Sequence, residues 1–293
     1  MTAALVKRPR NPAAKPAIRD IGAEITFDAL LRHVATNRFL PVPPAGAHTV
    51  GDGDFRAIGA EFLGHFVRHG GLKPEAAVLD IGCGLGRMAI PLTQYLREPA
   101  GRYHGIDIVA SAIEWCRQVI TPVYDRFTFE FLDVRSALYN PKGSAAPEAV
   151  PLPVETASFD FVIMTSVLTH MHAADAAAYL REAGRALQPG GRCFVSMFLM
   201  DEAAKTALRA KRSRLGFDPA GAGPEFHADP KQPLAAVAYD RDHFLAMAAA
   251  AGLAPVKPII AGSWSGHQGL TYQDLCILGP VASAKPAARG ARP

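Results

Sequence analysis

The chain has 293 residues, 49% of them hydrophobic and 20% charged, which suits one large globular domain. No apolar run reaches the roughly 18 residues that cross a membrane, and the N-terminus lacks the apolar core of a signal peptide, so we expect a cytoplasmic protein without a membrane partner. Five basic residues precede Asp20 and three follow Asp274, and together their charge is larger than the net charge of +4. The body between them is therefore mildly acidic, which argues against a nucleic-acid partner.

The N-terminal part of the chain is expected to form a tail and then a helical cap. Residues 1–20 and 280–293 carry the basic charge at the two ends and are predicted to be disordered. Within the cap, residues 21–70, apolar residues at helical spacing predict one helix over 21–38 and a second after Asp54, whose carboxylate can cap it.

A short apolar strand runs into a glycine-rich turn over residues 78–87. Gly82, Gly84 and Gly86 let the chain turn sharply and let a ligand approach the main chain. The first amides of the helix that follows favour polar or negatively charged ligand groups. The pattern predicts a site for a nucleotide-like ligand, although glycine patterns of this kind serve several cofactors.

Acidic residues come at the ends of the next two predicted strands. The strand at 103–108 contains Asp107, about 20 residues beyond the turn, where a ribose-binding carboxylate is expected. The strand at 127–132 is followed by Asp133. A nicotinamide-binding Rossmann domain is the competing interpretation, but it would place its third glycine at position 87, which is an arginine.

The order hydrophobic-Leu-Asp-hydrophobic-Gly-x-Gly-x-Gly at residues 78–86 resembles the signature of class I S-adenosylmethionine-dependent methyltransferases of the small-molecule type. The resemblance implies an α/β fold with a Rossmann-like seven-stranded mixed sheet, six strands parallel and the seventh antiparallel, helices on both faces and an N-terminal cap. It implies S-adenosylmethionine as the cofactor and S-adenosylhomocysteine as its product. The cofactor-binding residues that it implies are Asp80, Gly82, Cys83, Gly84, Gly86, Arg87, Asp107, Ile108, Asp133, Val134 and Thr165.

The resemblance also implies how these residues divide the cofactor. Asp80 and the glycines would contact the methionine portion, Asp107 the ribose hydroxyls, and Asp133 with Val134 the adenine. A carboxylate can accept both ribose hydroxyl bonds, which fits the role given to Asp107.

Chemistry is expected just after the fourth predicted strand, residues 159–164, because ligands bind beyond the carboxyl ends of parallel strands. His170 follows this strand and is the first candidate for a general base, since a neutral imidazole can accept a hydroxyl proton near neutral pH. A histidine that is merely hydrogen-bonded at the start of the next helix is the alternative. In the long loop at 136–153, Tyr139 and Asn140 are candidate substrate contacts or turn residues.

The C-terminal part supplies a possible lid and a second candidate base. The segment near 201–238, rich in glycine and proline towards its end, is expected to be a substrate lid. Strands at 253–260 and 272–278 flank a loop with Trp264 and His267. Trp264 could form a wall of the substrate site or close the core, and His267 is the second candidate base.

We therefore expect residues 71–279 to form a domain that methylates a hydroxyl of a small molecule, such as a sugar or a natural product. N- or S-methylation of a small metabolite is the alternative, and a non-catalytic cofactor-binding or RNA-associated protein is a third interpretation. The four cysteines are scattered, which favours free thiols and gives no metal site. A homodimer is compatible with the sequence.

Overall fold

The computed structural model describes residues 26–37, 40–43, 53–147, 151–218 and 223–281. The tails expected at 1–20 and 280–293 lie outside these residues, apart from positions 280 and 281, as do several residues of the expected cap.

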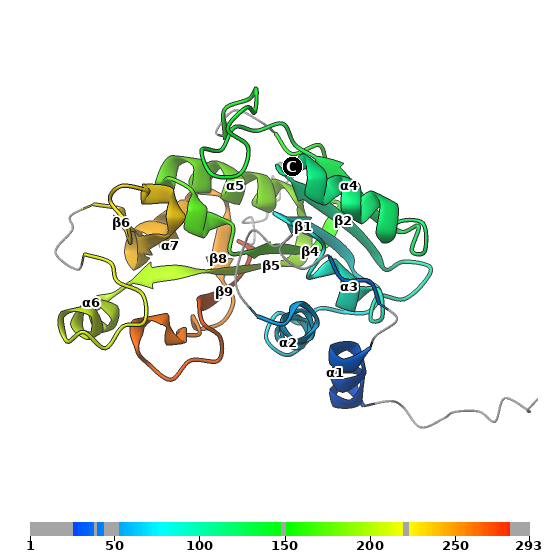
Figure 1. Ribbon diagram of the computed structural model, residues 1–293, viewed down its shortest axis with the longest axis horizontal. Helices are drawn as coiled ribbons and strands as arrows, with labels where there is room; N and C mark the ends of the chain where they lie inside the picture. Colours follow the sequence, from blue (N-terminus) through cyan, green and yellow to red (C-terminus); the bar gives the residue numbers. More distant parts are fainter. Residues whose placement is uncertain (1–25, 38–39, 44–52, 148–150, 219–222, 282–293) are drawn as a thin grey trace, which may run out of the picture.

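The architecture is a mixed β-sheet with helices on both faces (Figure 1). The sheet order is β3-β2-β1-β4-β5-β7-β6, and β9 pairs with both β5 and β8. The strands are β1 (Ala77–Ile81), β2 (Arg102–Asp107), β3 (Phe127–Phe131), β4 (Phe159–Thr165), β5 (Leu187–Met200), β6 (Glu225–His227), β7 (Val237–Asp240), β8 (Leu253–Pro255) and β9 (Asp274–Pro280).

The expected sheet is confirmed, with a different number of strands. Strands β1 to β5 pair in parallel, β9 is antiparallel to β5, and β8 is antiparallel to β9. Of these seven strands, β1 to β5 and β8 run one way and β9 runs against them. Strands β6 and β7 raise the sheet from seven strands to nine among the described residues. β7 pairs in parallel with the last residues of β5, Phe198–Met200, and β6 pairs antiparallel with β7.

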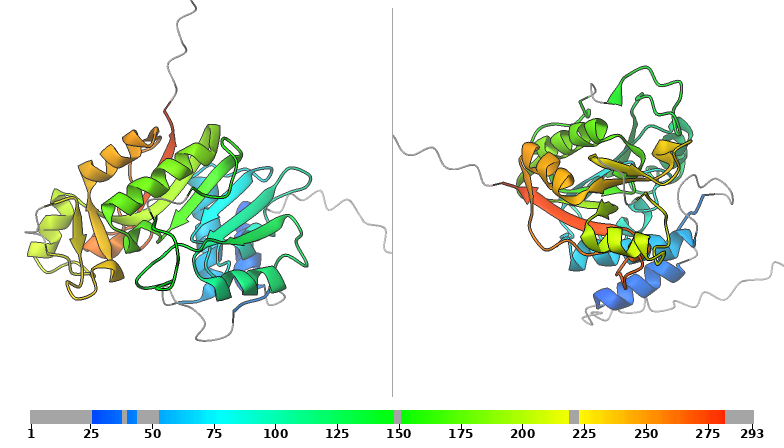
Figure 2. Two further views of the ribbon diagram at one scale, coloured as in Figure 1. Left: turned by 90° about the horizontal axis from the view of Figure 1, so that it is seen from above. Right: turned by 90° about the vertical axis from the view of Figure 1, so that its left-hand side faces the viewer.

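Helices α5 and α7 cover one face of the sheet, and α2, α3 and α4 cover the other (Figure 2). Short 3₁₀ helices lie in the loops of the described residues. The helices are α1 (Phe27–Thr36), α2 (Phe55–Arg68), α3 (Ala89–Leu92), α4 (Ala110–Val119), η2 (Leu168–His170), α5 (Ala173–Ala186), α6 (Glu202–Arg209), η3 (Pro233–Ala235), α7 (Arg241–Ala250) and η4 (Ser263–Ser265).

Aromatic residues join the cap helix α2 to the sheet. The ring of Phe66 on α2 lies 5.8 Å from that of Phe161 on β4 and 4.9 Å from that of Phe194 on β5, both edge to face. Asp54 caps this helix as predicted, because its carboxylate accepts the amide of Ala57 at 2.7 Å. Helix α2 is thereby held with its first turn directed at the carboxyl ends of the central strands.

The segment expected as a lid has a small core of its own at the end of the sheet away from β3 (Figure 2). Phe198 of β5 packs against Phe217 and Trp264, with ring centroids 5.7 Å and 5.4 Å away. Phe226 of β6 belongs to the same cluster. This segment, called the insertion below, is therefore a folded extension of the sheet with its own small core.

All four cysteines lie in the described part of the chain, and all are buried free thiols, as expected. Among the described helices, none has both the length and the apolar character needed to span a bilayer.

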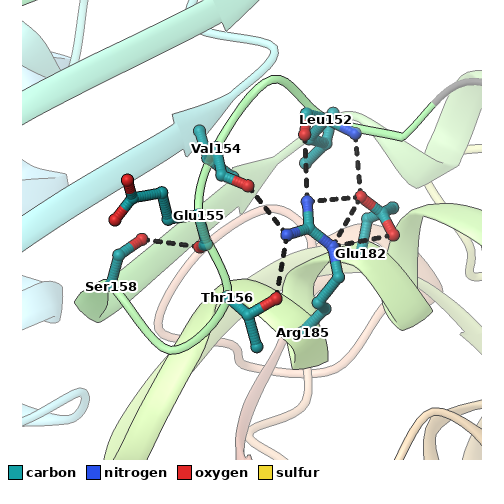
Figure 3. A network of polar contacts seen from close by, with 7 residues as sticks. All are labelled: Leu152, Val154, Glu155, Thr156, Ser158, Glu182 and Arg185. Atoms are coloured by element: carbon teal, nitrogen blue, oxygen red, sulfur yellow. Dashed lines mark hydrogen bonds and ion pairs between the residues drawn. The ribbon is translucent and has the colours of Figure 1, made fainter.

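Arg185 on α5 anchors the segment that leads into β4 (Figure 3). Its guanidinium donates to the carbonyls of Val154 at 2.7 Å and Leu152 at 2.9 Å, and to the carboxylate of Glu182 at 2.7 Å. Glu182 also accepts the amide of Leu152 at 2.8 Å. Burial, the largest single effect, raises the pKa of Glu182, but the bonds from Arg185 and Leu152 together outweigh it and the pKa is lowered.

We predict that Arg185→Met destabilises the fold by about 1.5–3 kcal/mol, because it leaves a half-buried carboxylate and two carbonyls without their charged donor. Urea unfolding measures the change. Arg181→Met is the matched control: this arginine is exposed on the same helix, and the free energy of unfolding should stay within about 0.5 kcal/mol. Equal stability of the two variants would contradict the anchoring role.

Candidate active site

A cavity of about 310 Å³ lies at the carboxyl ends of β1, β2 and β4. Parallel strands end at the same edge of a sheet, so residues far apart in the sequence meet there. Eight of the residues expected to bind the cofactor line this cavity: Gly82, Cys83, Gly84, Arg87, Asp107, Ile108, Val134 and Thr165.

The glycine turn leaves main chain exposed to the cavity. Gly82 and Gly84 have φ values of +76° and +52°, which favour glycine. A Cβ added at Gly84 would meet no atom within 4 Å, so open space lies beside this residue. Gly86 has another role, because a Cβ there would come within 2.8 Å of Ile120. Gly86 therefore packs the turn and does not line the cavity.

Asp107 joins the glycine turn to the end of β2. Its Oδ2 accepts the amide of Gly84 at 2.7 Å, and its Oδ1 accepts the amide of Val109 at 2.8 Å. Burial raises the pKa of Asp107, and the backbone amides oppose that shift. Each carboxylate oxygen has a further lone pair, so Asp107 can still accept bonds from a ligand in the cavity.

Asp80 does not line the cavity, which corrects the role given to it above. Alternation along β1 directs Asp80 to the face covered by α2, α3 and α4, where its Oδ2 accepts the hydroxyl of Tyr103 at 2.6 Å. Its Oδ1 has no hydrogen-bond partner among the described residues. Burial raises the pKa of Asp80 to about 7.

Asp133 and Asn140 also lie outside the cavity lining. The carboxylate of Asp133 is exposed and accepts the hydroxyl of Ser144 at 2.6 Å, and the Asn140 amide donates to the carbonyl of Val134 at 3.0 Å. These bonds shape the loop after β3. Asp133 and Asn140 therefore have a structural role in this loop, and Val134 is the neighbouring residue that lines the cavity.

The chain leaves β4 through a residue in an unusual conformation. Ser166 has φ +58°, a region that non-glycine residues rarely adopt and that is found often at functional sites. Its amide donates to Ser196 Oγ at 3.0 Å, and its hydroxyl donates to Gln273 Oε1 at 3.0 Å. Both partners hold the turn that leads to η2 and His170.

His170 lines the cavity beside Tyr139, with ring centroids 5.4 Å apart in an edge arrangement. Its Nδ1 lies 3.0 Å from the carbonyl of Leu234 in η3, so the ring donates a proton there. In the neutral ring Nε2 is then the unprotonated nitrogen. The pKa of His170 is lowered, because burial outweighs the opposing effect of the hydrogen bonds to the Leu234 and Ala235 carbonyls.

The structure does not bring His267 and Trp264 to this cavity. Trp264 is fully buried in the core of the insertion, and its Nε1 donates to Asp274 at 2.8 Å. Asp274 also accepts the amides of Leu199 and Gly262, which fixes the loop. His267 lies exposed on the same loop. The core alternative for Trp264 is the one found, and His267 has no place beside the site.

Several lining residues were not expected from the sequence. Phe55, Ile58 and Phe62 of α2 face the cavity from the segment expected as an N-terminal cap, although no single residue of that segment was expected to line the site. The Arg87 guanidinium lies 5.6 Å from the centre of the Phe55 ring, which joins the cap to the glycine turn. Asp175, in the first turn of α5, also lines the cavity. No periodicity in the sequence distinguishes it from a capping acid.

These residues fit an adenosyl ligand that carries an amino-acid portion. Apolar side chains of Ile108, Leu132 and Val134 provide a wall for a flat ring. Asp107 offers carboxylate lone pairs beside that wall, and the open main chain at Gly84 leaves room for a polar group. These features suit a ligand such as S-adenosylmethionine, which carries an adenine ring, ribose hydroxyls and an amino-acid group.

Comparison with known proteins supports the same conclusion. Residues 72–221, just over half of the chain, match a family model described as a methyltransferase domain. Over 131 residues the chain is 33% identical to 27-O-demethylrifamycin SV methyltransferase of Amycolatopsis mediterranei, a match of 44% of this chain and 41% of that protein. The chain thus aligns with about two fifths of that relative's length.

The similar solved structures are distant in sequence. The PH0226 protein of Pyrococcus horikoshii OT3 has a TM-score of 0.52 and 14% identity, over 80% of this chain and 94% of that one. The 1,6-didemethyltoxoflavin-N1-methyltransferase of Burkholderia thailandensis has a TM-score of 0.46 and 18% identity, over 76% of both chains.

The family match covers β1 through β5 with their loops, which supply most of the cavity lining, whereas α2 and Leu234 lie outside it. The chain therefore belongs to the methyltransferase-domain family, within the class I S-adenosylmethionine-dependent type.

Proposed function

We propose that this methyltransferase acts on a hydroxyl group of a small molecule and that His170 is its general base. The observation that carries the proposal is the position of His170: it lines the cavity, it is half-buried, and its Nδ1 donates to the Leu234 carbonyl. A hydroxyl is a poor nucleophile until its proton is removed, and a neutral imidazole within reach can take that proton.

The surroundings of His170 favour an acceptor with an apolar body. Tyr139 and Leu234 contact His170, Met171 follows it in the chain, and all three line the cavity. Such a wall suits an aromatic or aliphatic natural product better than a free sugar. The relative from Amycolatopsis mediterranei is a methyltransferase named for an O-demethylated acceptor, 27-O-demethylrifamycin SV, which supports the choice of oxygen.

The chain's own residues would divide the work as follows. Asp107 would bind the ribose hydroxyls, and Gly82, Cys83 and Gly84 would face the amino-acid end. Phe55 and Phe62 would exclude water, since both line the cavity from α2. When bound, S-adenosylmethionine supplies an electrophilic methyl group on a positively charged sulfur. His170 Nε2 would accept the proton that the acceptor hydroxyl loses.

Replacing Asp107 tests the cofactor site. We expect Asp107→Ala to weaken binding of S-adenosylhomocysteine by about 1–3 kcal/mol, because charge-assisted hydrogen bonds are lost. Titration calorimetry measures the affinity. Asp133→Ala is the matched control, since Asp133 follows the neighbouring strand but lies outside the cavity. If both variants bind as well as the unaltered protein, Asp107 does not hold the ribose.

Replacing His170 tests the base. We expect His170→Asn to lower kcat by about 100-fold or more while the affinity for S-adenosylhomocysteine stays unchanged. Acceptors are screened by release of S-adenosylhomocysteine, and the best one is used for both proteins. His267→Asn, on an exposed loop, should keep full activity. Full activity of His170→Asn would argue for an N or S acceptor that needs no base.

The pH profile gives an independent test. Burial lowers the pKa of His170 below its ordinary value of 6.5, so the ring stays unprotonated to lower pH than a free histidine. We therefore expect kcat/KM to fall on the acid side, as the base is protonated, with the midpoint of this limb below 6.5. This acid limb should vanish in His170→Asn. A limb with its midpoint above 6.5 would point to another group.

A further inference from the structure

Three metal-ligating side chains meet beside the active site, outside the cavity lining. His172 immediately precedes α5, and Glu225 and His227 lie two residues apart on β6. One potential ligand atom from each residue lies within 4.8 Å of the other two. No pattern in the sequence indicates this cluster, because His172 and Glu225 are 53 positions apart.

The geometry points to a binding site for a zinc-type divalent cation at His172, Glu225 and His227. His172 Nδ1 lies 3.2 Å and His227 Nε2 4.0 Å from Glu225 Oε2. A tetrahedral zinc ion with nitrogen and oxygen ligands keeps its ligand atoms about 3.3 Å apart, so small side-chain rotations would close the site. Two imidazoles with one carboxylate suit Zn²⁺, whereas Mg²⁺ and Ca²⁺ prefer oxygen ligands.

The hydrogen bonds around His227 orient it as metal-ligating histidines are oriented. Its Nδ1 lies 3.0 Å from the carbonyl of Pro233, so this nitrogen carries a proton and donates it. In the neutral ring, Nε2 then presents a lone pair towards the carboxylate of Glu225. A backbone carbonyl on the opposite ring nitrogen fixes the tautomer in many metal sites. A cation between these two lone pairs would replace their repulsion with two attractive contacts.

The place of the site gives the cation a structural role. It would join β6, in the insertion, to the start of α5. Pro233 and Leu234 are neighbours in η3, and their carbonyls accept from His227 and His170 respectively. A cation at His227 would therefore steady the turn that orients His170. Because none of the three ligands lines the cavity, the cation would not touch the acceptor.

Metal titration of the full chain tests the site. Protein without an affinity tag is stripped with EDTA and titrated with Co²⁺, whose visible absorption reports its coordination, and then with Zn²⁺. We expect one equivalent to bind, Zn²⁺ to displace Co²⁺, and millimolar Mg²⁺ to displace neither. Zn²⁺ should also slow amide hydrogen exchange in residues 225–240. A thiolate-to-cobalt absorption band would place the metal on cysteine and overturn the proposal.

Variants locate the binding. His227→Gln and Glu225→Gln should each lower the affinity for Zn²⁺ by more than about 10-fold, while the matched control His33→Gln, exposed on α1, should leave it unchanged. Circular dichroism checks that each variant is folded. If the unaltered protein binds no metal, the cluster is a hydrogen-bonded ion pair. If both ligand variants bind as tightly as the unaltered protein, the metal lies elsewhere. Either result overturns the proposal.

Discussion

The carboxylate of Asp107 is the interaction on which the active site depends. It accepts one amide from the glycine turn and one from the start of α4, so two loops that follow different strands share a single side chain. Burial makes that carboxylate costly, and the amides compensate for the cost. The cavity therefore has its shape before any ligand arrives, and the ligand does not have to order the loops itself.

Much of the fold and of the cofactor site could be predicted from the sequence because the signals are local. The glycines at 82, 84 and 86 adopt positive φ, as their spacing indicated, and Asp107 ends its strand where a ribose-binding acid is expected. Parallel strands buried on both faces give continuous apolar runs, and β1 is buried at all five positions. His170 follows β4 directly, so its place at the cavity required only the general rule for parallel sheets.

What the sequence could not give depends on the direction of side chains and on distant pairing. Asp80 lies on the same strand as the motif, yet alternation turns it towards Tyr103 and away from the cavity. Trp264 and His267 share a loop whose course is set by Asp274, a residue that periodicity assigns only to a strand. Strands β6 and β7 have three and four residues, too few to show an alternating pattern.

Strand β5 has a consequence for how this enzyme can change. The middle of β5 pairs with β9, and its last three residues pair with β7. One strand is therefore shared by the nucleotide-binding half, strands β1 to β5 with β8 and β9, and by the insertion. A swinging motion of the whole insertion would break main-chain hydrogen bonds, so substrate exchange has to rely on smaller rearrangements at η3 and the surrounding side chains. The insertion also buries Phe217, Phe226 and Trp264 in a cluster of their own, but Val237 and Tyr239 of β7 pack in the same core as β1 and β4. Substitutions around Phe217 can therefore accumulate with little effect on the nucleotide-binding strands, whereas those in β7 alter both at once.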